Sequence, residues 1–448
     1  MLKTTTTKTI DFTAFSARLR AYPALAARFC EVLDLVECSG EGILNANKAE
    51  ERAIEVLRDM GNDALHAWAR RAAEKAVMRA RDTGQLQAHL KKKVTWHTTF
   101  GGVAVVETQF RHKKTRVLLR PFSQAADVKC HGYSRPLERA VVDFGADVPY
   151  GQVPGKVKEH YGVELPGSAA RTLTTRHARA LKQHQVLPPK GRSTGNEVPC
   201  TLIAEVDGSM VPIVQPGVDG GDARKGKVLK WQEARLCTVR RDGTLAPTFG
   251  ATLGSVQEAG ALWRATAEST GLTPRATVHG IADGAPWIAA QFEQHFGRQG
   301  AFLVDFFHVC EYLAAAAKVC APQEPEQWLE RQKTRLKTSD LPAVLAELNA
   351  WALPVGVRAA DGTQDPVFAC LRYLSARRGQ LDYAGALARG LPIGSGEIES
   401  ANRYIVQARL KRAGAWWTAQ NAQAMLQLRT LRGNGQWDSY WETYREAA

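Results

Sequence analysis

The sequence predicts an α/β protein with a largely helical N-terminal region. Between residues 200 and 310, apolar stretches with the character of strands alternate with helical segments. Residues 10 to about 90 instead show helical spacing, and a basic stretch at 184–199, rich in Pro, Gly and polar residues, predicts a linker. A chain of 448 residues is too long for one ordinary core, so we expect two or three domains.

Composition and charge narrow the class of protein. The chain is 44% hydrophobic and 23% charged, as in ordinary globular proteins, and no apolar run reaches the roughly 18–20 residues of a membrane span. The N-terminus MLKTTTTKTIDFTAF has no apolar signal-peptide core, so we expect a cytoplasmic protein. Lys and Arg outnumber Asp and Glu by 59 to 45, which suits a polyanionic partner, most often nucleic acid; a merely basic enzyme is the alternative.

Packed helices are predicted for the N-terminal region, residues 1–93. Asn45 is suited to cap the helix that follows it. Ile54, Leu57, Leu65 and Trp68 then recur at helical spacing among many charged residues. Both a helical bundle and a dimerisation arm fit this pattern.

A small β-hairpin module is predicted at residues 94–133. Apolar and polar residues alternate there, and Gly101-Gly102 interrupts the alternation as a turn would. Val117 to Leu119 fits a third strand. The loop RHKKTR before it is strongly basic.

Residues 134–183 have the size and layout of a helix-turn-helix. A helix ends at Gly162, the turn VELPG follows, and Ser168 is expected to cap a second helix. That helix would offer Arg and Thr to phosphates or base edges of the major groove. Its candidate contacts are Arg171, Thr172, Thr175, Arg176 and Arg179. Any two short helices around a glycine turn give a similar pattern, which is the alternative.

The eight cysteines are scattered along the chain, with no CxxC pair. This pattern is neither a disulfide framework nor a zinc-site spacing, so we expect reduced cysteines in the core. The candidate chemistry therefore comes from other residues.

Acidic residues near glycines suggest that chemistry. Asp207 in IAEVDGSM and Asp283 in VHGIADGAPW are each expected at the end of an apolar strand and each precede a glycine that keeps bulk away from the carboxylate. An acid of the GSGEIES turn, Glu397 or Glu399, would complete a set of three. Two Mg²⁺ ions about 3.5–4 Å apart, held by carboxylates, are the usual means of phosphodiester cleavage. Asp-Gly is also a common turn, so spacing alone leaves both interpretations open.

These segments are similar to a known family. VDGSMVPI, ADGAPWI and DFFHVCEYLAAAAK resemble DDE transposases of bacterial insertion sequences, and GLPIGSGEIESANRYIVQARLKRAGAWWT resembles their ISKra-type group. The resemblance covers roughly residues 95–440. Relatives often carry a cysteine-bearing ribbon before the helix-turn-helix, whereas this chain offers only Cys130 and His131 there; a structural zinc site takes four ligands.

The resemblance implies a ribonuclease-H-like catalytic core at 200–310 and 390–432, with a helical insertion at 311–389 and a tail at 433–448. It implies two bound Mg²⁺ ions, for which Mn²⁺ can substitute, and cleavage of transposon ends followed by strand transfer to target DNA. The partners would be double-stranded DNA and further copies of the chain, in the bacterial nucleoid. The family pattern places the third acid at Glu399, beside Asp207 and Asp283.

Helix geometry bears on the choice between Glu397 and Glu399. Two residues apart on a helix, they point about 200° apart and cannot both reach one metal pair. Glu397 has a ready structural role as a negative charge in the first helical turn. The apolar residues of this helix nevertheless lie closer to the Glu397 side, which favours the opposite choice. The motif outweighs that signal, and we assign Glu399.

Other residues have weaker cases. Asp305 and His308 follow a predicted strand and could position DNA or support the metal ligands; Asp305 also competes with Asp283, and a satisfied buried His308 is an equal alternative. In RLKRAGAWW, phosphate contacts are predicted for Arg409, Lys411 and Arg412. Either Trp416 or Trp417 could stack on a base; the alternative is that these adjacent residues divide between core and surface. Trp231 is expected in the core.

The sequence thus predicts a DDE-type DNA transposase that binds the terminal inverted repeats of its element. A two-metal nuclease or resolvase that cuts without joining is the enzymatic alternative. A DNA-binding regulator with an inert catalytic fold is the other, although binding would not need all three acids.

Overall fold

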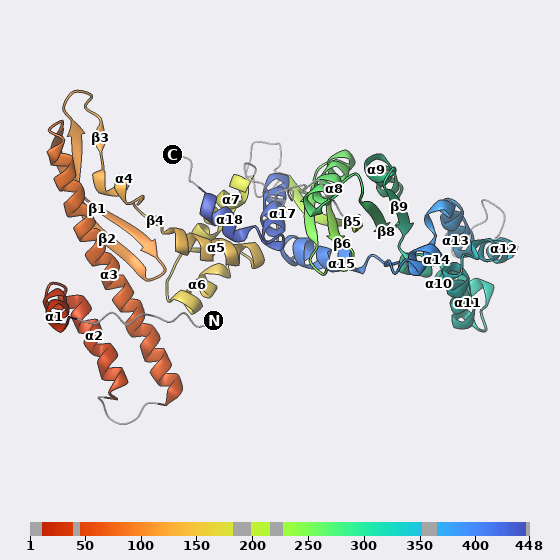
Figure 1. Ribbon diagram of the computed structural model, residues 1–448, viewed down its shortest axis with the longest axis horizontal. Coiled ribbons are helices and arrows are strands. Elements are labelled where there is room, and N and C mark those ends of the chain that lie inside the picture. Colours follow the sequence, from red (N-terminus) through yellow and green to blue (C-terminus); the bar gives the residue numbers. More distant parts are fainter. Residues whose placement is uncertain (1–10, 39–44, 182–198, 216–226, 352–364, 445–448) are drawn as a thin grey trace. The chain divides into compact units, whose positions relative to one another are not determined.

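The computed structural model describes residues 11–38, 45–181, 199–215, 227–351 and 365–444. It divides into two compact units, Met1–Leu173 and Thr174–Ala448, each a mixture of helices and one sheet (Figure 1). Apart from Pro199, the predicted linker lies outside the described residues, as does the end of the predicted tail from residue 445. No described helix is both long and apolar enough to cross a membrane.

The first unit begins with helices, as predicted. They are α1 (Phe12–Arg20), α2 (Pro23–Val36) and α3 (Ala46–Asp82). The Asn45 side chain caps α3 by accepting a hydrogen bond from the Lys48 N–H at 3.0 Å, which confirms the predicted helix start. The α3 face that packs on the sheet is a stripe of alanines, however: Ala69, Ala73, Ala76 and Ala80 are buried.

The apolar residues that the sequence placed at helical spacing on α3 are mostly exposed. Ile54, Leu57 and Trp68 have exposed fractions of 43%, 55% and 48%, and Leu65 is partly buried against the sheet. Small alanines let the helix approach the strands closely, which a run of larger apolar side chains would prevent. The larger residues therefore lie on the remaining face.

A four-stranded sheet follows, in the order β3-β2-β1-β4. Its strands are β1 (Leu86–Thr98), β2 (Gly101–His112), β3 (Leu118–Leu119) and β4 (Gly132–Tyr133), with α4 (Pro121–Ala125) between the last two. The predicted hairpin is present, but it begins at Leu86 rather than at residue 94. Gly84, at φ +65°, follows the end of α3, and residues 87–93 are exposed on both faces, so they lack the alternation that marks a half-buried strand.

Three helices occupy the region predicted as helix-turn-helix. They are α5 (Arg135–Asp147), α6 (Val153–Tyr161) and α7 (Gly167–Ala180). Gly162 ends α6 in the left-handed conformation, at φ +65°, as the sequence indicates. Ser168 does not cap α7, because the helix already begins at Gly167. The boundary between the two units falls within α7, at Leu173 and Thr174.

The second unit is built on a five-stranded sheet in the order β7-β6-β5-β8-β9. The strands are β5 (Thr201–Gln215), β6 (Val228–Arg241), β7 (Thr248–Thr252), β8 (Thr277–Ala282) and β9 (Gly300–Val304). β6 is antiparallel to β5 and β7, whereas β5, β8 and β9 run parallel. The strands and the helices between them confirm the predicted α/β character of this part.

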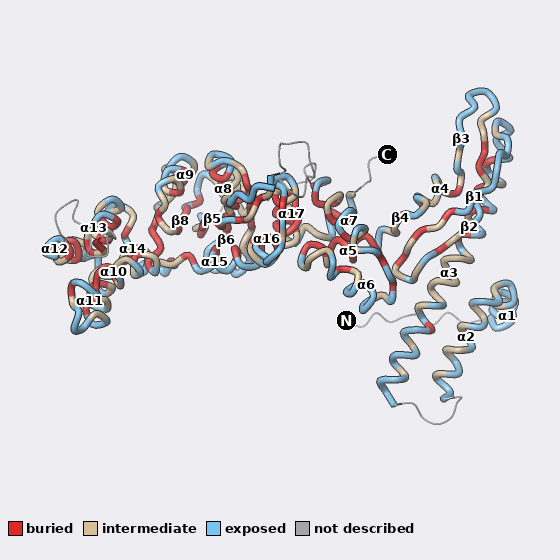
Figure 2. Tube along the Cα trace, turned by 180° about the vertical axis from the view of Figure 1, so that it is seen from behind, coloured by how far each residue is buried: buried red, intermediate tan, exposed pale blue. Residues whose placement is uncertain are grey.

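Helices cover both faces of this sheet (Figures 1 and 2). The even-numbered residues of β5 pack with α8 (Val256–Thr270) and α9 (Pro286–Phe296), where Trp263, Phe292 and Phe296 form an aromatic core. The odd-numbered residues face the other side of the sheet. There Ile203 belongs to the core formed by the helices that follow β9 in the chain. Asp207 is odd-numbered, so the candidate site belongs to this second face.

A group of helices follows β9, where the sequence predicts helical structure. Its helices are α10 (Phe306–Cys320), α11 (Pro325–Lys337), α12 (Leu341–Trp351), α13 (Pro366–Ser375), the 3₁₀ turn η2 (Arg378–Gln380) and α14 (Tyr383–Ala388). They share one apolar core with Ile281 and Leu303 of the sheet. The insertion is therefore packed directly against the parallel strands.

The chain then returns to the sheet through a broken helix. It consists of α15 (Gly396–Ala401), the π-type segment η3 (Asn402–Gln407) and α16 (Ala408–Leu410), and is followed by α17 (Ala419–Gly433) and α18 (Trp437–Thr443). The buried Arg429 of α17 donates to the carbonyls of Tyr404 and Ile405, which satisfies backbone groups that the wider π turn leaves open.

The cysteines are free thiols, but they are not all in the core. Cys237, Cys320 and Cys370 are buried, whereas Cys30 and Cys38 are exposed. Trp231 is also misassigned by the sequence, because 57% of it is exposed on β6.

Candidate active site

Asp207, Asp283 and Asp305 follow the parallel-paired parts of three neighbouring strands at matching positions in the register. β5 and β8, and β8 and β9, pair in parallel up to the residues just before these acids. Extending that register places the three side by side, with neighbouring strands about 4.8 Å apart. The sequence predicts Asp207 at the end of a strand. That prediction is wrong, because β5 continues to Gln215. Asp207 lies where β5 loses its parallel neighbour.

The Asp207 carboxylate is partly buried, and each of its oxygens accepts one hydrogen bond. One oxygen accepts from the Gly208 N–H at 2.7 Å and the other from Asn402 Nδ2 at 2.7 Å. Burial raises its pKa to about 6; the hydrogen bonds oppose this shift, and the negative charges of Asp283 and Glu399 add to it. Asp283 and Glu399 are therefore near enough for their charges to act on Asp207.

Glu397 and Glu399 have different surroundings. The Glu397 carboxylate is 2.6 Å from Arg240 Nε of β6, in a partly buried ion pair. Glu399 is exposed, and its carboxylate forms no hydrogen bond or ion pair with a described residue. Glu399 is therefore available to a ligand, whereas Glu397 is occupied by a structural contact.

The Glu399 helix is held against β5 by side chains on alternate strand residues. Glu205 accepts from the Ile398 N–H at 2.8 Å, and Asp207 accepts from Asn402. Ser209 Oγ lies 3.4 Å from Gln407 Nε2, one π-helical turn beyond Asn402. The strand thus fixes both the height and the rotation of the helix that carries Glu399.

Glu205 is the most strongly perturbed acid of this face. It is 2% exposed, and burial raises its pKa to about 8. The Ile398 N–H and Arg240 oppose the shift, and the charges of Glu397 and Asp305 add to it. Burial therefore favours the neutral form of Glu205, which accepts from the helix and lies two residues from Asp207.

The helical insertion holds the Asp283 turn. Asp283 Oδ1 accepts from the Ala285 N–H at 2.9 Å, within the turn itself. Tyr373 of α13 donates its hydroxyl to the Asp283 carbonyl at 2.6 Å, and Arg377 donates to the Gly284 carbonyl from Nε at 2.9 Å and from Nη2 at 2.8 Å. The backbone around Asp283 is fixed from outside, while its second carboxylate oxygen is not committed to a described residue.

The glycines after the two acids make room for neighbouring side chains rather than for the carboxylates. A Cβ on Gly208 would lie 2.0 Å from Glu233 Oε1 of β6. Gly284 has φ +76°, and a Cβ there would lie 2.8 Å from both Tyr373 and Arg377. This corrects the reason that the sequence suggests for the Asp-Gly pairs.

Asp305, the competing acid, is committed to structure. It is 3% exposed and begins α10, where Oδ1 accepts from the N–H groups of Phe307 and His308 at 2.6 and 3.0 Å. Its other oxygen accepts from both the N–H and the hydroxyl of Ser395. Asp305 thus anchors the GSG turn, and each of its carboxylate oxygens already accepts two hydrogen bonds, against one for each oxygen of Asp207. His308 is partly exposed, not buried, and lies 3.3 Å from Glu311.

Asp207, Asp283 and Glu399 are the right kind of ligand for a metal pair, but they are not already arranged around one. The negative charges of Asp283 and Glu399 act on Asp207, and a bound cation would relieve this repulsion. Yet the described residues include no group of three or more His, Cys, Asp or Glu side chains close enough to hold a metal ion. The carboxylates would have to draw closer around one.

Comparisons with known proteins bear on part of the chain. A model of an uncharacterised protein family, UPF0236, matches residues 273–443. That span is less than half of the chain; it includes Asp283 and Glu399 but not Asp207. No curated protein matches. Among solved structures, the chain is similar to the Drosophila P element transposase strand transfer complex at 7% sequence identity and a TM-score of 0.25, covering 72% of this chain and 83% of that chain. The likeness to a transposase is faint.

The DNA contacts predicted on α7 differ in exposure. Arg171 and Thr172 are exposed, and Thr175 and Arg176 are half-buried. Arg179 is exposed but donates to Asn421 Oδ1 at 2.9 Å. Only the first two therefore lie open without a rearrangement of their neighbours.

The RLKRAGAWW segment divides between surface and core. Lys411 and Arg412 are exposed, whereas Arg409 is 3% exposed and lies over the Trp417 ring at 4.8 Å. Trp417 is 5% exposed, and its carbonyl accepts from the Val214 N–H at 2.7 Å. Arg409 and Trp417 as they lie cannot contact DNA, because they join this segment to β5. Trp416 is 62% exposed, beneath Lys227.

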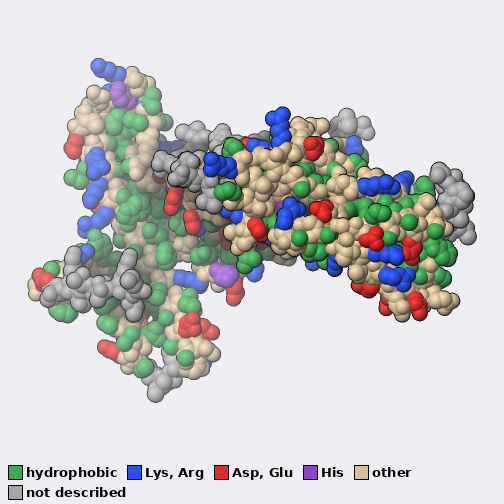
Figure 3. Space-filling model, turned by 45° about the vertical axis from the view of Figure 1, so that its right-hand side comes forward, with side chains coloured by type: hydrophobic (Ala, Val, Ile, Leu, Met, Phe, Trp, Pro, Cys, Tyr) green, Lys and Arg blue, Asp and Glu red, His purple; other side chains and the backbone are tan. Residues whose placement is uncertain are grey.

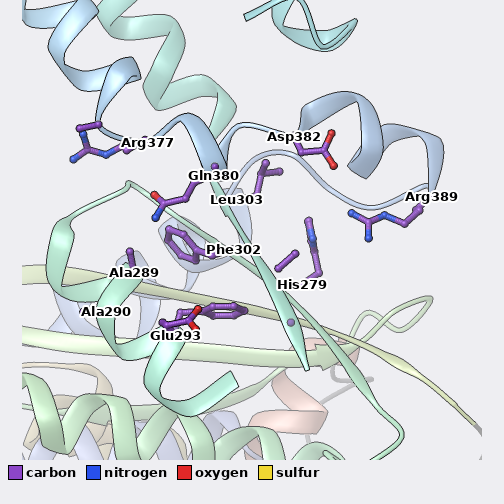
Figure 4. Close-up of a pocket in the computed structure, with 15 residues that line it drawn as sticks. His279, Ala289, Ala290, Glu293, Phe302, Leu303, Arg377, Gln380, Asp382 and Arg389 are labelled. Carbon is purple, nitrogen blue, oxygen red and sulfur yellow. The ribbon is translucent and has the colours of Figure 1, made fainter. Parts of the chain in front are cut away.

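A pocket of about 640 Å³ lies beside the Asp283 turn, between the β8–β9 edge, α9 and the segment around η2 (Figure 4). Its lining includes the buried His279, together with Arg377 and Arg389. His279 Nε2 donates to the Pro392 carbonyl at 2.8 Å, which ties β8 to the segment leading into the GSG turn. Burial and the charge of Arg389 lower the His279 pKa.

Four site residues were not predicted from the sequence. Glu205 and Asn402 left a signal: an acid inside an apolar strand, and a buried amide three residues after Glu399 on the same side of the helix. Tyr373 and Arg377 left none, because they lie about 90 residues from Asp283 in the chain.

Proposed function

We propose that this chain is a DNA transposase of the DDE class, which cleaves the ends of its element and joins them to target DNA. The observation that carries the proposal is geometric: Asp207 lies where β5 loses its parallel neighbour β8, Asp283 follows the end of β8, and Asn402 of the Glu399 helix donates to Asp207. Each acid is carried by a different element. The strand β5, the turn after β8 and the helix α15 are far apart in the sequence, which makes a chance gathering of three acids less natural than a functional one.

The architecture of the second unit supports a ribonuclease-H-like core. A mixed five-stranded sheet carries the first two acids, and the third arrives on a helix after a helical insertion. The insertion is part of the core rather than an appendage, since its Tyr373 and Arg377 hold the Asp283 turn.

Asp207, Asp283 and Glu399 would hold two Mg²⁺ ions, which when bound supply activation of the attacking oxygen and stabilisation of the leaving oxygen. The residues of the chain prepare that arrangement. Asn402 orients Asp207 from the Glu399 helix, and Arg240 keeps Glu397 turned away through its ion pair. Asp305 and Ser395 fix the turn from which the helix begins.

DNA is proposed to bind through side chains that are exposed in the structure. Arg171 and Thr172 of α7 are proposed to contact the terminal repeats. Lys411, Arg412 and Trp416 are proposed to contact DNA near the acids, the cations on phosphates and the indole on a base.

The test is cleavage of cognate end DNA in Mg²⁺, with wild type compared with Asp207→Ala, Asp283→Ala, Glu399→Ala and Glu397→Ala. We expect the first three variants to lose cleavage by at least about 10³-fold, because each removes a carboxylate that would hold the Mg²⁺ ions. Glu397→Ala should keep most activity and lose some stability, since it removes only the pair with Arg240.

The outcomes separate the competing functions. Loss in Glu397→Ala with near-normal activity in Glu399→Ala would overturn the assignment of the third acid. Hydrolysis of end DNA without joining to a target would favour a nuclease or resolvase. Sequence-specific binding with no metal-dependent cleavage would leave a DNA-binding regulator.

A further inference from the structure

The second half of α3 and the hairpin that follows carry most of the positive excess of the chain. Between Arg70 and Arg120 there are 13 Lys and Arg and 3 Asp and Glu, a net charge of +10 within a chain of net charge +14. These residues form one continuous part of the first unit, in which α3 packs on β1 and β2. The proposed function uses none of them.

The three lysines of β1 lack side-chain partners among the described residues, whereas Lys113 donates to the Gly84 carbonyl at 2.7 Å and Arg111 Nη2 lies 3.3 Å from His89 Nε2. The side chains of Lys91, Lys92 and Lys93 are exposed and form no hydrogen bond or ion pair within the described chain. Glu107, which lies opposite Lys92, cannot neutralise it, because the buried Glu107 carboxylate accepts from the Ser123 N–H and hydroxyl at 2.8 and 2.7 Å. Crowded like charges destabilise a fold unless an external anion compensates them.

The first half of the same unit is different. Arg28 of α2 lies within 3.2 Å of Glu31, Asp59 and Asp63 in one network of ion pairs. The charges are therefore paired where α2 meets α3. Where α3 meets the hairpin, the charges of Lys91, Lys92 and Lys93 have no acidic partner in the described part of the chain. The contrast argues that the bare cations serve a partner rather than the fold.

The shape of the hairpin fits a groove of duplex DNA. On one face, Val94 and Trp96 are buried against the rest of the unit. On the other, Lys91 and Lys93 lie opposite Thr108 and Val106, which leaves the lysines standing above smaller neighbours. A groove of about 650 Å³ beside this face has Arg70, Lys91 and Lys93 in its lining, with Glu74 its only acid. The B-DNA major groove, about 12 Å wide, admits a two-stranded ribbon.

The loop at the end of the ribbon continues the charge (Figure 3). Lys114 and Arg116 are exposed, and no described residue pairs with their side chains. Arg116 has φ +63°, a conformation that glycine adopts at lower cost. An arginine at this position fits a side chain that is used for binding.

We propose that this basic hairpin arm, comprising β1, β2 and the loop at residues 111–116, binds duplex DNA. The ribbon lies along the major groove, and its lysines contact the phosphates. Duplex RNA is the less suitable polyanion, because its deep, narrow major groove does not admit the ribbon. The proposal takes DNA as the partner from the proposed function, but it uses neither the acidic site nor α7.

The experiment measures binding of the full chain to a labelled random-sequence DNA duplex of about three helical turns. Fluorescence anisotropy is recorded across a salt series, without divalent cations. The test variant is Lys91→Gln/Lys92→Gln/Lys93→Gln. The matched control, Arg275→Gln/Arg298→Gln/Lys318→Gln, removes three exposed cations from the second unit. A Lys→Arg triple at 91–93 keeps the charge.

At about 0.1 M salt we expect the Gln triple at 91–93 to bind about 10- to 100-fold more weakly, with a salt slope reduced by roughly 2–3. The control and the Arg triple should bind like wild type. Equal binding by the Gln triple and the control would overturn the proposal. So would equal affinity for duplex RNA, or loss of binding to phosphatidylserine vesicles with DNA binding unchanged.

The two proposals fail separately. Lysine-dependent DNA binding in a chain that never cleaves DNA would refute the transposase and retain the arm. Cleavage that depends on Asp207 and Glu399, with DNA binding indifferent to Lys91–Lys93, would do the reverse.

Discussion

Asp283 and Asp305 show how surroundings distinguish two acids that look alike in the sequence. Each follows a parallel strand of apolar residues and starts a turn into a helix. One carboxylate oxygen of Asp283 accepts a hydrogen bond within its own turn. Asp305 accepts four hydrogen bonds and is buried beneath the GSG turn. The neighbours of each acid, rather than its own segment, decide which one is free for chemistry.

His279 gives a pH dependence that can be measured. Burial is the main reason that its pKa is lowered from 6.5; Arg389 lowers it further, while the Pro392 carbonyl and Asp242 oppose the shift. The folded protein therefore binds fewer protons here than the unfolded chain as the pH falls below about 6.5. The stability that neutral His279 contributes is present above that pH and is lost on acidification, by up to about 1.4 kcal/mol per pH unit.

Urea unfolding of wild type and His279→Gln between pH 7.5 and 5.5 measures this contribution. Glutamine keeps a donor for the Pro392 carbonyl but does not titrate. We expect the free energy of unfolding to fall less steeply with pH in the variant. Parallel curves for the two proteins would show that His279 has no part in the acid sensitivity.

Among the elements, the Glu399 helix and α13 position the acids from opposite directions. The helix meets β5 at Glu205, Asp207 and Ser209, through residues spaced by four and then five along the helix. The π-type segment accommodates the longer step, since its hydrogen bonds span five residues. α13 approaches instead from the insertion and holds the backbone of the Asp283 turn.

Removing the Tyr373 hydroxyl tests the contact from α13. Tyr373→Phe deletes the hydrogen bond to the Asp283 carbonyl and should slow cleavage about 10-fold, because a small displacement of a reacting group is costly. Tyr312→Phe is the matched control: its ring stacks on Tyr373 at 4.1 Å, and its hydroxyl holds no part of the Asp283 turn. Equal rates for both variants would exclude a role for the Tyr373 hydroxyl.

At the scale of the whole chain, the boundary between the two units lies before the linker that the sequence predicts. The sequence suggests a break at the 184–199 linker, but the second unit begins at Thr174, within α7. His177 is fully buried there: its Nδ1 lies 2.8 Å from the Tyr440 hydroxyl, and its ring lies 4.6 Å from Trp441. The second half of α7 therefore belongs to the core of the unit that contains the acids.

Two fragments test this boundary. Residues 167–448 retain His177, whereas residues 184–448 start at the predicted linker and lose it. We expect the shorter fragment to melt at least about 5 °C lower, because it leaves the α18 aromatic residues uncovered. Equal melting temperatures would mean that α7 contributes nothing to the second unit.

Structural features that depend on neighbouring residues could be predicted from the sequence. The strand around Asp207, the turns at Gly162 and Gly284, the cap at Asn45 and the helical insertion all follow from short-range patterns of polarity and conformational preference. The charge excess also pointed to a polyanion. The choice of Asp207, Asp283 and Glu399 as metal ligands stays a prediction.

Questions about which side chains are free required the packed molecule. Glu397 is engaged because Arg240, over 150 residues away, reaches it, and Trp417 is buried because β5 pairs beside it, whereas Trp416 next to it stays exposed. No local pattern encodes these partners. Burial and pairing are properties of surfaces that meet only after the chain has folded.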